Sequence, residues 1–296
     1  MHDRFSYFAY GLHILADFAL WPWGANAASA TCDAVTGVRV ELAGEGSPYE
    51  ALGFRPGLTE AVLDWPGVGG FLVSQGKKIS VRPAPGATLK EVALVAAGPA
   101  LALLLEQRGF VVLHGSCAAI AGSATALLGA SGAGKSTIAA TLREANHELI
   151  SDGMTVISLS GGVPHAHPGP PHLKLWPDAI QRMSESSVVT EPVARQDEKR
   201  WYNARSGVAL RPMPLRKVFL LEAGEGVSST PLGPAAALIG LVKHYFLADF
   251  AEGPSHAFIL ERCGGISSAI SVARLCRGNT PQDLQAVVAQ LVASEL

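Results

Sequence analysis

Residues 126–153, ALLGASGAGKSTIAATLREANHELISDG, decide how the rest of the chain is interpreted. The stretch contains Gly129, Gly134, Lys135 and Ser136 in the spacing G-x-x-x-x-G-K-[ST]. Glycines at these positions let backbone N–H groups turn inward around phosphate oxygens, while the lysine supplies positive charge and the serine hydroxyl can bind Mg²⁺. A glycine turn that binds nothing is the alternative. We favour a phosphate-binding loop, because an apolar run precedes the motif and a helix-forming segment follows it.

The segment before this loop indicates which kind of sheet leads into it. Residues 110–132, FVVLHGSCAAIAGSATALLGASG, contain two apolar runs separated by AGS, which is the pattern of an antiparallel hairpin. The second strand, about Thr125 to Leu128, runs directly into the loop. Rossmann-like phosphate loops follow a strand in a parallel βαβ unit instead. We therefore predict an α/β fold with a mixed, partly antiparallel sheet.

The residues that follow the loop predict several further elements. Residues 135–145, KSTIAATLREA, are good helix formers with an apolar face. Residues 147–159, HELISDGMTVISL, predict strand, turn and strand. Residues 160–172, SGGVPHAHPGPPH, are so rich in proline and glycine that we predict no regular structure there. A helix is predicted to begin at Pro177.

Nearer the C-terminus, residues 208–224 predict another strand. Residues 236–250 and residues 280–296 have the apolar spacing of amphipathic helices. No internal repeat is present in the sequence.

The candidate chemistry centres on the loop and on one acidic residue after it. The predicted nucleotide-binding residues are Gly129, Ala130, Ser131, Gly132, Ala133, Gly134, Lys135, Ser136 and Thr137. The expected ligand is ATP with Mg²⁺, and Ser136 and Asp152 are the predicted metal ligands. Asp152 ends an apolar run after the loop helix, and a carboxylate there can also accept a proton from an attacking hydroxyl. A turn aspartate before Gly153 is the structural alternative.

His114 lies in the first strand of the predicted hairpin, beside the loop. From that position an imidazole can hydrogen-bond a phosphate or orient a catalytic base. A lone histidine in an apolar strand is also often a core residue with its hydrogen bonds satisfied. The residues alone leave both interpretations open.

The loop and its flanking residues resemble the catalytic domain of HPr kinase/phosphorylase and its shorter relatives, the HPr-kinase-like proteins found with lasso-peptide biosynthesis genes. The matching positions are His114–Gly115, Gly129–Thr137, His147 and the apolar-Ser-Asp segment that ends at Asp152. Outside these about forty residues, YGLHILADFALW (10–21) and LKLWPDAI (173–180) look like the shorter relatives more loosely. The family's catalytic domain has a fold like that of phosphoenolpyruvate carboxykinase, in which antiparallel strands lead into the phosphate loop. The resemblance implies that fold here.

The resemblance also implies roles for individual residues. Asp152 would deprotonate an acceptor serine, Lys135 and Mg²⁺ would stabilise the transferring phosphoryl group, and His114 would be an active-site residue. The parent enzymes carry a second aspartate where this chain has Gly153, and their later arginine-rich signature is not recognisable here. These departures disfavour the phosphorylase reaction and HPr as the substrate.

The sequence therefore predicts an ATP-dependent kinase that phosphorylates a serine hydroxyl of a peptide or protein. A lasso-peptide precursor is the most specific acceptor that the resemblance implies. Two alternatives remain open, a kinase for a small hydroxylated metabolite and a nucleotide-gated binding module that transfers nothing. The residues leave open the oligomeric state, a homo-oligomer included, and the choice between ATP and GTP.

Composition excludes several other classes of protein. The chain has 296 residues, of which 48% are hydrophobic and 16% charged, and its formal net charge is −2 at pH 7. It can therefore bury a sizeable core and is not a disordered chain. It lacks the positive charge expected of a nucleic-acid binder. Its length favours two domains or one large α/β domain.

Proline and glycine positions suggest a domain boundary near residue 86. Residues 1–86 carry short apolar runs punctuated by glycine and proline, which is typical of a β-rich domain, and we expect this domain to contribute to substrate recognition. RPAPGA (82–87) is the predicted linker, so residues 87–296 would form the catalytic domain. The latter would begin with a helix from about Thr88 to Gln107. Its start carries a capping box with Glu91, and Gly109 supplies the stop.

The cysteines and the apolar runs bear on the cellular compartment. Cys32, Cys117, Cys263 and Cys276 show no CxxC pairing, which argues against a zinc site and a disulfide-stapled scaffold. We therefore expect a reducing, cytoplasmic environment.

Two stretches superficially resemble targeting or membrane segments. Residues 4–30 look like a signal peptide, but His13 and Asp17 interrupt the apolar run, so we predict strands there instead. Residues 92–105 contain a Gly-Pro pair and are shorter than the ~20 residues of a membrane span. No transmembrane helix is predicted.

Three other clusters rank lower as functional candidates. His165, His167 and His172 are close enough in sequence to bind zinc but lack companion ligands, so we expect a surface loop near the substrate entrance. Lys199, Arg200 and Arg205, beside Trp201, form either a lid that adds positive charge to the transition state or a solvated turn. Arg274 and Arg277 either bind a peptide carboxylate or face water.

Overall fold

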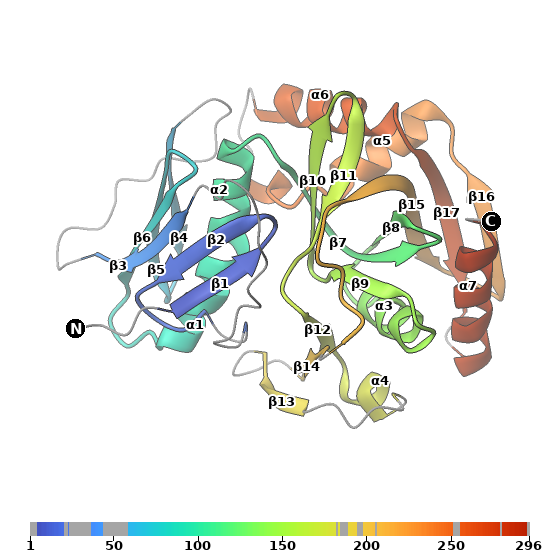
Figure 1. The fold of residues 1–296 in the computed structure, drawn as a ribbon, viewed down its shortest axis with the longest axis horizontal. Coiled ribbons are helices and arrows are strands. Elements are labelled where there is room, and N and C mark those ends of the chain that lie inside the picture. Colours follow the sequence, from blue (N-terminus) through green and yellow to red (C-terminus); the bar gives the residue numbers. More distant parts are fainter. Residues whose placement is uncertain are drawn as a thin grey trace. The chain divides into compact units, whose positions relative to one another are not determined.

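The chain divides into two compact units. The computed structural model describes residues 5–20, 23, 37–43, 59–181, 183, 189–193, 198–204, 206–250, 255–278 and 280–294. The first unit consists of Met1–Val112 with Phe246–Leu260, and the second of Leu113–Tyr245 with Glu261–Leu296 (Figure 1). Two residues named in the sequence analysis, Cys32 and Arg205, lie outside the described residues.

The first unit contains a six-stranded sheet in the order β1-β2-β3-β6-β5-β4. Its strands are β1 (Phe5–Ala9), β2 (Leu12–Ala16), β3 (Val38–Leu42), β4 (Glu60–Trp65), β5 (Gly69–Ser74) and β6 (Lys78–Pro83). The β-rich character predicted for this region is confirmed, and the strands β1 and β2 lie within the stretch that resembles a signal peptide.

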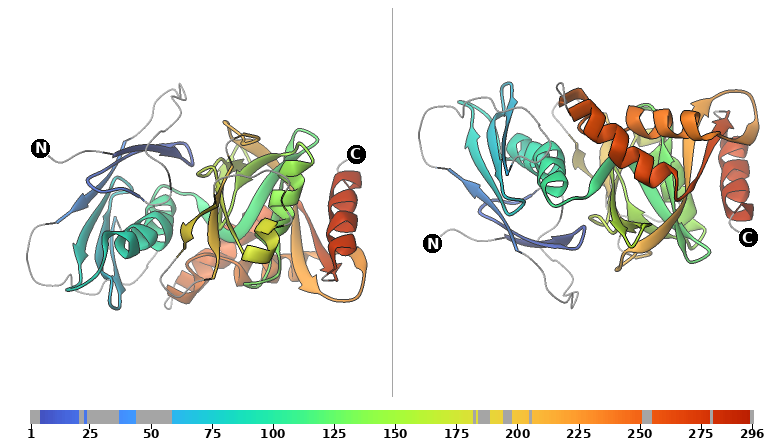
Figure 2. Two further views of the ribbon diagram at one scale, coloured as in Figure 1. Left: turned by 90° about the horizontal axis from the view of Figure 1, so that it is seen from below. Right: turned by 90° about the horizontal axis from the view of Figure 1, so that it is seen from above.

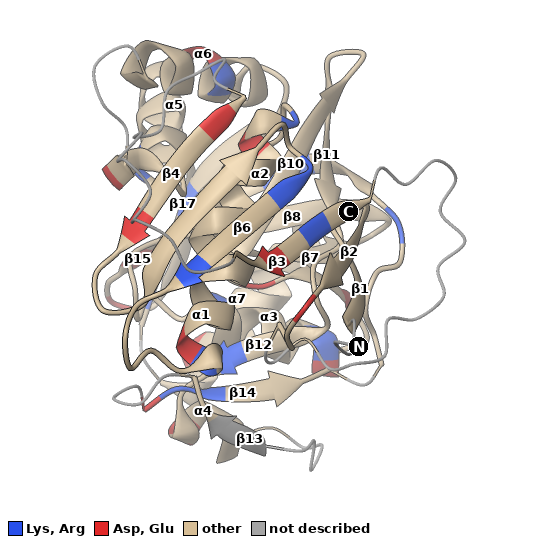
Figure 3. Cartoon of the chain, turned by 90° about the vertical axis from the view of Figure 1, so that its left-hand side faces the viewer, with Lys and Arg blue, Asp and Glu red and all other residues tan. Residues whose placement is uncertain are grey.

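Alternation of side chains gives this sheet one apolar and one charged face. Val38 and Val40 on β3 are buried, whereas Arg39 between them is exposed. Arg39 pairs with Glu41 at 3.0 Å, and Lys78 on β6 pairs with the same carboxylate at 3.2 Å. Figure 3 shows basic and acidic residues on β3 and β6. The charged face is solvated, so these pairs contribute little to stability.

The helical segment after β6 belongs to this first unit. It runs as α1 (Leu89–Val95), a π-helical turn η1 (Ala96–Ala100) and α2 (Leu101–Gln107), with a kink at Gly98, which precedes a proline. The predicted capping box at Thr88 is present.

This helical segment packs on β5 and β6, and the Gln107 side chain accepts a hydrogen bond from the backbone N–H of Gly76 at 2.8 Å. The division between units therefore follows Val112, whereas the sequence analysis placed it at residue 86. The prolines after β6 mark only the turn between strand and helix.

The second unit is built on an eight-stranded mixed sheet with the main order β11-β10-β7-β8-β15-β17-β16, in which β9 also pairs with β7. Its strands are β7 (Val111–Ile120), β8 (Ser123–Leu128), β9 (Glu148–Ser151), β10 (Met154–Ser160), β11 (Val163–His167), β15 (Met213–Ala223), β16 (Val227–Pro231) and β17 (Ser271–Arg277). The predicted hairpin is confirmed, because β7 and β8 pair antiparallel. β15 is parallel to both β8 and β17, so the sheet is mixed as predicted.

Helices cover both faces of β15 in this sheet. α3 (Lys135–Glu144) and α7 (Pro281–Ala293) contact each other, and their apolar residues share a core with Phe219 and Leu221. Leu220 points the opposite way, toward α5 (Pro234–Lys243). A Cβ at Gly240 of α5 would lie 2.2 Å from the Leu220 side chain, so glycine permits this close contact. Figure 2 shows these helices from two further directions.

Smaller elements complete the chain. They are α4 (Pro177–Gln181), a 3-10 turn η2 (Ala248–Phe250), α6 (Ser255–Ser267) and the three-stranded sheet of β12 (His172–Leu175), β14 (Arg200–Asn203) and β13 (Val189–Pro192). The helix predicted to begin at Pro177 is confirmed. None of the helices among the described residues has the length and apolar character needed to cross a membrane.

The prediction that residues 160–172 lack regular structure is wrong for residues 163–167 and 172, which lie in strands, and holds for residues 168–171. β11 pairs antiparallel with β10, and His172 begins β12. Gly161 and Gly162 both have positive φ, at 58° and 79°, which is the two-residue hairpin turn that glycine pairs favour. The glycines therefore signal a tight turn between two strands rather than a loop.

Candidate active site

The glycine loop connects the end of β8 to the start of α3. Gly134 is the N-cap of α3 and has a left-handed φ of 90°. α3 then runs for ten residues from Lys135, so its unpaired N–H groups and positive dipole end face the loop. This is the geometry in which helix N-termini bind phosphate.

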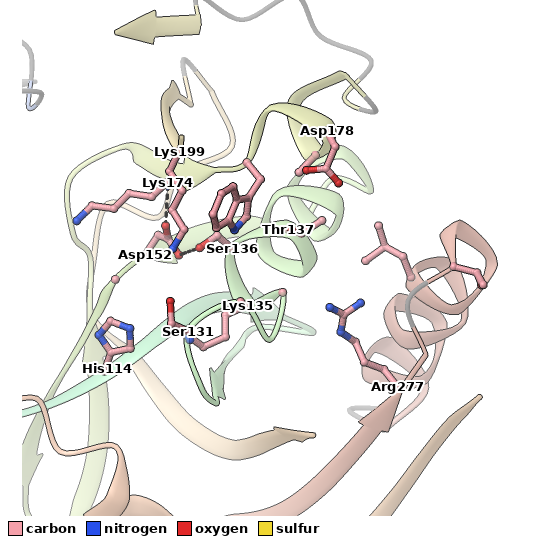
Figure 4. A pocket seen from close by; sticks show the side chains of 17 residues that line it. His114, Ser131, Lys135, Ser136, Thr137, Asp152, Lys174, Asp178, Lys199 and Arg277 are labelled. Atoms are coloured by element: carbon pink, nitrogen blue, oxygen red, sulfur yellow. Dashed lines mark hydrogen bonds between the residues drawn. The ribbon is translucent and has the colours of Figure 1, made fainter. Parts of the chain in front are cut away.

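A cavity of about 310 Å³ opens beside this loop, entirely within the second unit (Figure 4). One side is formed by the loop residues Ser131, Gly132 and Gly134–Thr137, whereas Gly129, Ala130 and Ala133 of the predicted loop do not line the cavity. Residues from distant parts of the sequence form the rest, and those that bear on chemistry are His114, Asp152, Lys174, Trp176, Lys199 and Arg277. The loop, Asp152 and His114 thus meet at one site.

Asp152 is held by three hydrogen bonds from three different elements. Its Oδ1 accepts from the Ser116 hydroxyl of β7 at 2.5 Å and from the Ser136 hydroxyl of α3 at 2.8 Å. Its Oδ2 accepts from the backbone N–H of Lys174 on β12 at 2.9 Å. A carboxylate has about four lone-pair sites, so Oδ2 keeps one site for a further donor. This arrangement goes well beyond a turn aspartate before Gly153.

Gly153 occupies the position where the resembling enzymes carry a second aspartate. Its φ of 83° is left-handed and completes the turn between β9 and β10. It also lines the cavity, and a Cβ there would meet no atom within 4 Å. The site therefore has room for the missing carboxylate but does not contain it.

Lys135 is buried and folded back onto the loop. Its Nζ donates to the carbonyl oxygens of Gly129 at 2.8 Å and Ala130 at 3.0 Å. Burial lowers the pKa of Lys135, the charge of Asp152 raises it, and the charge of Lys199 lowers it. The amine therefore has local partners that phosphate oxygens can replace.

His114 lies on β7 and faces the cavity. More than a third of its surface is open, but protein surrounds the rest of the ring. The resulting desolvation, together with the positive charges of Lys135 and Lys174 and against the opposing effect of Asp152, lowers the pKa of His114 to about 4. His114 is therefore neutral near pH 7 and can exchange hydrogen bonds there without adding positive charge.

Cations outnumber carboxylates around the cavity. The basic lining residues are Lys135, Lys174, Lys199 and Arg277, and the acidic ones are Asp152 and Asp178. The chain as a whole has a net charge of −2, so positive charge is concentrated at this site. Such a concentration favours a ligand that carries several negative charges.

Two aromatic side chains hold the lysines of this site. The Nζ of Lys199 lies 5.4 Å from the ring centre of Trp176, which lines the cavity and is 39% exposed. The Nζ of Lys174 lies 4.8 Å from the ring centre of Trp201. In a cation–π contact of this kind, the face of the aromatic ring attracts the ammonium group electrostatically.

The structure separates the lower-ranked candidates from one another. Lys199 and Arg277 line the cavity, whereas Arg274 pairs with Glu222 at 3.2 Å outside it. Arg200 is part of β14 and does not line the cavity, and Arg205 lies outside the described residues.

The histidines predicted for a surface loop belong to strands instead. His167 hydrogen-bonds Ser158 at 2.8 Å, and His172 is buried with its ring edge-on to Trp201. His165 bonds the carbonyl oxygen of Val163. None of the three lines the cavity, so the prediction of a loop near the substrate entrance is wrong. His147 does not line it either.

Sequence reasoning gave no role to three residues of this site, Ser116, Lys174 and Trp176, and it did not predict that Arg277 contacts the loop. Ser116 was part of the quoted hairpin, and its position two residues after His114 places both on the same face of one strand. Lys174 and Trp176 lie in LKLWPDAI (173–180), whose looser resemblance assigned no role to either residue. No local signal links Arg277 to the loop, because strand pairing far along the chain brings it there.

The comparisons with known proteins add little to this geometry. No protein-family model matches the chain, and no curated protein matches it. Among solved structures, the chain is similar to the Hpr(Ser) kinase/phosphatase from Coxiella burnetii with a TM-score of 0.33 and 8% sequence identity. That similarity covers 62% of this chain and 88% of the other. At this distance the similarity carries no inference.

Proposed function

We propose that this protein binds a nucleoside triphosphate with Mg²⁺ and transfers the γ-phosphoryl group to a hydroxyl group. The observation that carries the proposal is the convergence of Lys135 and Ser136, at the phosphate end of α3, with the carboxylate of Asp152. Phosphoryl transfer needs chiefly positioning and neutralisation of charge. A loop of amides, a lysine and a carboxylate beside them provide both.

The residues present fit a magnesium ion. The Ser136 hydroxyl and Asp152 Oδ1 lie 2.8 Å apart and are both hard oxygen donors. Mg²⁺ in nucleotide enzymes is held by one or two protein oxygens together with phosphates and water. Among the described residues, no three histidine, cysteine or acidic side chains converge on one point, which is compatible with a site completed by the nucleotide. When bound, Mg²⁺ would neutralise charge on the β- and γ-phosphates.

The chain's own residues then divide the remaining work. Loop amides hold the phosphates, and Lys135 exchanges its two carbonyl partners for phosphate oxygens. Asp152 accepts the proton of the acceptor hydroxyl through the remaining lone pair of Oδ2. The acceptor oxygen forms a bond to the γ-phosphorus as the bond to the β,γ-bridging oxygen breaks, and the nucleoside diphosphate leaves with that electron pair.

Neutral His114 acts as a hydrogen-bonding partner in this arrangement. Its low pKa excludes an imidazolium at neutral pH, so it does not add to the charge that Lys135 and Lys199 provide. From β7 it faces the same space as Asp152, where a hydroxyl acceptor must enter. We propose that it orients the acceptor or the γ-phosphate.

The acceptor that we propose is a serine hydroxyl of a peptide or protein, with a lasso-peptide precursor as the first peptide to test. Incubation with γ-labelled ATP, Mg²⁺ and such peptides should transfer label to peptide. Label on a small hydroxylated metabolite would instead identify a metabolite kinase. Release of free phosphate alone, with every acceptor class, would contradict transfer.

Asp152→Asn provides the sharpest control for this assay. The substitution keeps the side chain's shape but removes the base, so transfer should fall by about 10²- to 10⁴-fold. Nucleotide binding, measured by calorimetry without acceptor, should change much less, because loop amides and Lys135 hold the phosphates. Normal phosphorylation by this variant would exclude Asp152 as the base.

One observation favours the alternative of a nucleotide-gated binding module. Asp152 already accepts three hydrogen bonds, which link β7, β12 and α3. Such bonding is typical of a structural residue, whereas a catalytic base needs lone pairs that are free to accept a proton. In that case nucleotide binding would break the Ser136 contact and alter the link. The label assay separates this function from transfer, because a module yields only slow release of phosphate.

A further inference from the structure

Arg277, the last residue of β17, contacts the glycine loop although β15 separates β17 from β8, the strand that leads into the loop. Its Nε donates a 2.9 Å hydrogen bond to the carbonyl oxygen of Ala133, which is 144 positions earlier in the chain. Its Nη1 donates to the carbonyl oxygen of Gly278 at 3.2 Å. Among the described residues, nothing accepts a hydrogen bond from Nη2.

The guanidinium of Arg277 occupies the space beside Gly134 that a side chain would fill. A Cβ at Gly134 would lie 2.3 Å from Nη2 and 2.8 Å from Cζ. Arg277 also lines the cavity together with Gly134. Nη2 is therefore a cationic donor at the inner edge of the loop, next to the first residues of α3.

Arg277 lies at the opposite end of the cavity from Asp152. The charges that act on His114 include those of Asp152, Lys135 and Lys174, so these groups form one cluster. The carboxylate whose charge acts on Arg277 is that of Asp283 on α7. Figure 4 shows Lys135 and Ser131 between the two ends, with Arg277 on one side and His114 and Lys174 on the other.

A nucleoside triphosphate binds a glycine loop in one direction, with each phosphate at a defined part of the loop. The lysine of the motif reaches the β- and γ-phosphates, and the loop amides cradle the α- and β-phosphates. The γ-phosphate therefore belongs at the Asp152 end, which holds the proposed base. The α-phosphate belongs at the other end, where Arg277 meets Gly134.

We propose that Arg277 is a nucleotide-binding residue, which donates through Nη2 to the α- or β-phosphate while Nε holds the glycine loop in place. This inference rests on the proposed nucleotide binding and adds the orientation of the ligand, with the diphosphate end at β17 and the transferable phosphate at Asp152. It also gives the loop a second cation besides Lys135.

The surroundings of Arg277 suit this role. Burial lowers its pKa, the charge of Asp283 raises it, and a guanidinium remains charged at neutral pH in either case. Asp283 is committed to the capping box of α7, where it accepts hydrogen bonds from the backbone N–H and the hydroxyl of Thr280. The carboxylate therefore leaves the guanidinium available to an incoming phosphate.

The test compares nucleotide affinities of the full chain with those of matched arginine variants. Arg277→Gln should weaken binding of ADP and of ATP by the same factor, roughly ten- to a hundredfold for one charge-assisted hydrogen bond in a half-buried site. Arg274→Gln removes the same charge from the same strand outside the cavity and should change either affinity less than twofold. Lys135→Gln should weaken ATP more than ADP, because that lysine reaches the γ-phosphate.

Further measurements separate ligand binding from support of the loop. Arg277→Lys keeps the charge but cannot donate to Ala133 and to phosphate at once, so it should bind with intermediate affinity. Melting temperatures without nucleotide show whether each variant folds. Equal nucleotide affinity of folded Arg277→Gln and Arg274→Gln, or a loss confined to ATP, would overturn the inference. Failure of the unaltered protein to bind any nucleotide would overturn the proposed function itself.

Discussion

The Ser116 hydroxyl of β7 donates a 2.5 Å hydrogen bond to the same Asp152 oxygen that accepts from Ser136 of the glycine loop. A residue of β7 and a residue of the glycine loop therefore orient the same carboxylate, that of Asp152. Ser116 is fully buried, so no water competes for this bond. Orientation of Asp152 depends on the hairpin as much as on the turn that carries it.

Ser116→Ala should therefore impair transfer without impairing nucleotide binding. Loss of one buried hydrogen bond should lower the free energy of unfolding by about 1 kcal/mol. A carboxylate held by two hydrogen bonds instead of three is less precisely oriented, which should lower the rate of phosphoryl transfer by roughly tenfold, since a misplacement of 1 Å can cost up to a hundredfold. Steady-state kinetics and calorimetry measure the two effects. Ser123→Ala on the same hairpin but outside the cavity is the control, and equal rates for both variants would contradict the role of Ser116.

Gly134→Ala and Gly132→Ala should differ in stability for one steric reason. Both glycines have left-handed φ angles, 90° and 83°, so each alanine costs about 1–2 kcal/mol. Only at Gly134 does the new Cβ meet the Arg277 guanidinium, at 2.3 Å, while at Gly132 it meets nothing within 4 Å. Urea unfolding should therefore show a larger loss for Gly134→Ala.

A double variant isolates this steric contribution. Adding Arg277→Gln to Gly134→Ala shortens the side chain that the Cβ meets and should remove the difference from Gly132→Ala, leaving the backbone cost. If the free-energy changes of the two single variants simply add in the double variant, the Cβ at position 134 and the Arg277 side chain do not clash.

Gly153→Asp should strengthen the metal dependence of nucleotide binding. A side chain at this position enters open cavity space, and aspartate tolerates a left-handed φ better than most residues. A second carboxylate beside Asp152 should lower the Mg²⁺ concentration needed for half-maximal ATP binding by several fold. Gly153→Asn, with the same shape and no charge, should leave that concentration near the original value. Equal Mg²⁺ dependence of both variants would place the metal elsewhere.

Buried neutral histidines should make the protein sensitive to mild acid. Burial and the charge of Lys174 together lower the pKa of His172 to about 3, and burial and the charge of His165 together lower the pKa of His167 to about 4. The unfolded chain takes up these protons near pH 6.5 while the folded chain does not. Stability is therefore complete above pH 6.5 and falls as the pH is lowered toward these values.

His172→Phe tests this linkage, because phenylalanine can keep the edge-on contact with Trp201. Each such histidine contributes a slope of up to about 1.4 kcal/mol per pH unit below pH 6.5. Urea unfolding at several pH values between 4 and 7 should show a slope reduced by up to that amount in the variant. An unchanged slope would mean that His172 is protonated in the folded protein.

Local patterns in the sequence predicted the parts of the fold that local chemistry controls. The glycine loop, the hairpin of β7 and β8 and the capping box at Thr88 each depend on residues a few positions apart. The error over residues 160–172 has a local cause as well, because a glycine pair serves equally in a loop and in a tight turn between strands. Only pairing with β10 selects the strand.

The sequence by itself determined that a glycine loop ends in Lys135 and Ser136 at the start of a helix, because these residues are only a few positions apart and local spacing sets their arrangement. Only the tertiary structure decided what faces the loop. Lys174 arrives through the three-stranded sheet, and Arg277 arrives because β17 runs parallel to β15, which runs parallel to β8. Strand pairing between separate parts of the chain leaves no periodic mark near either residue, so the charges that define the two ends of the cavity become visible only once the sheets are assembled.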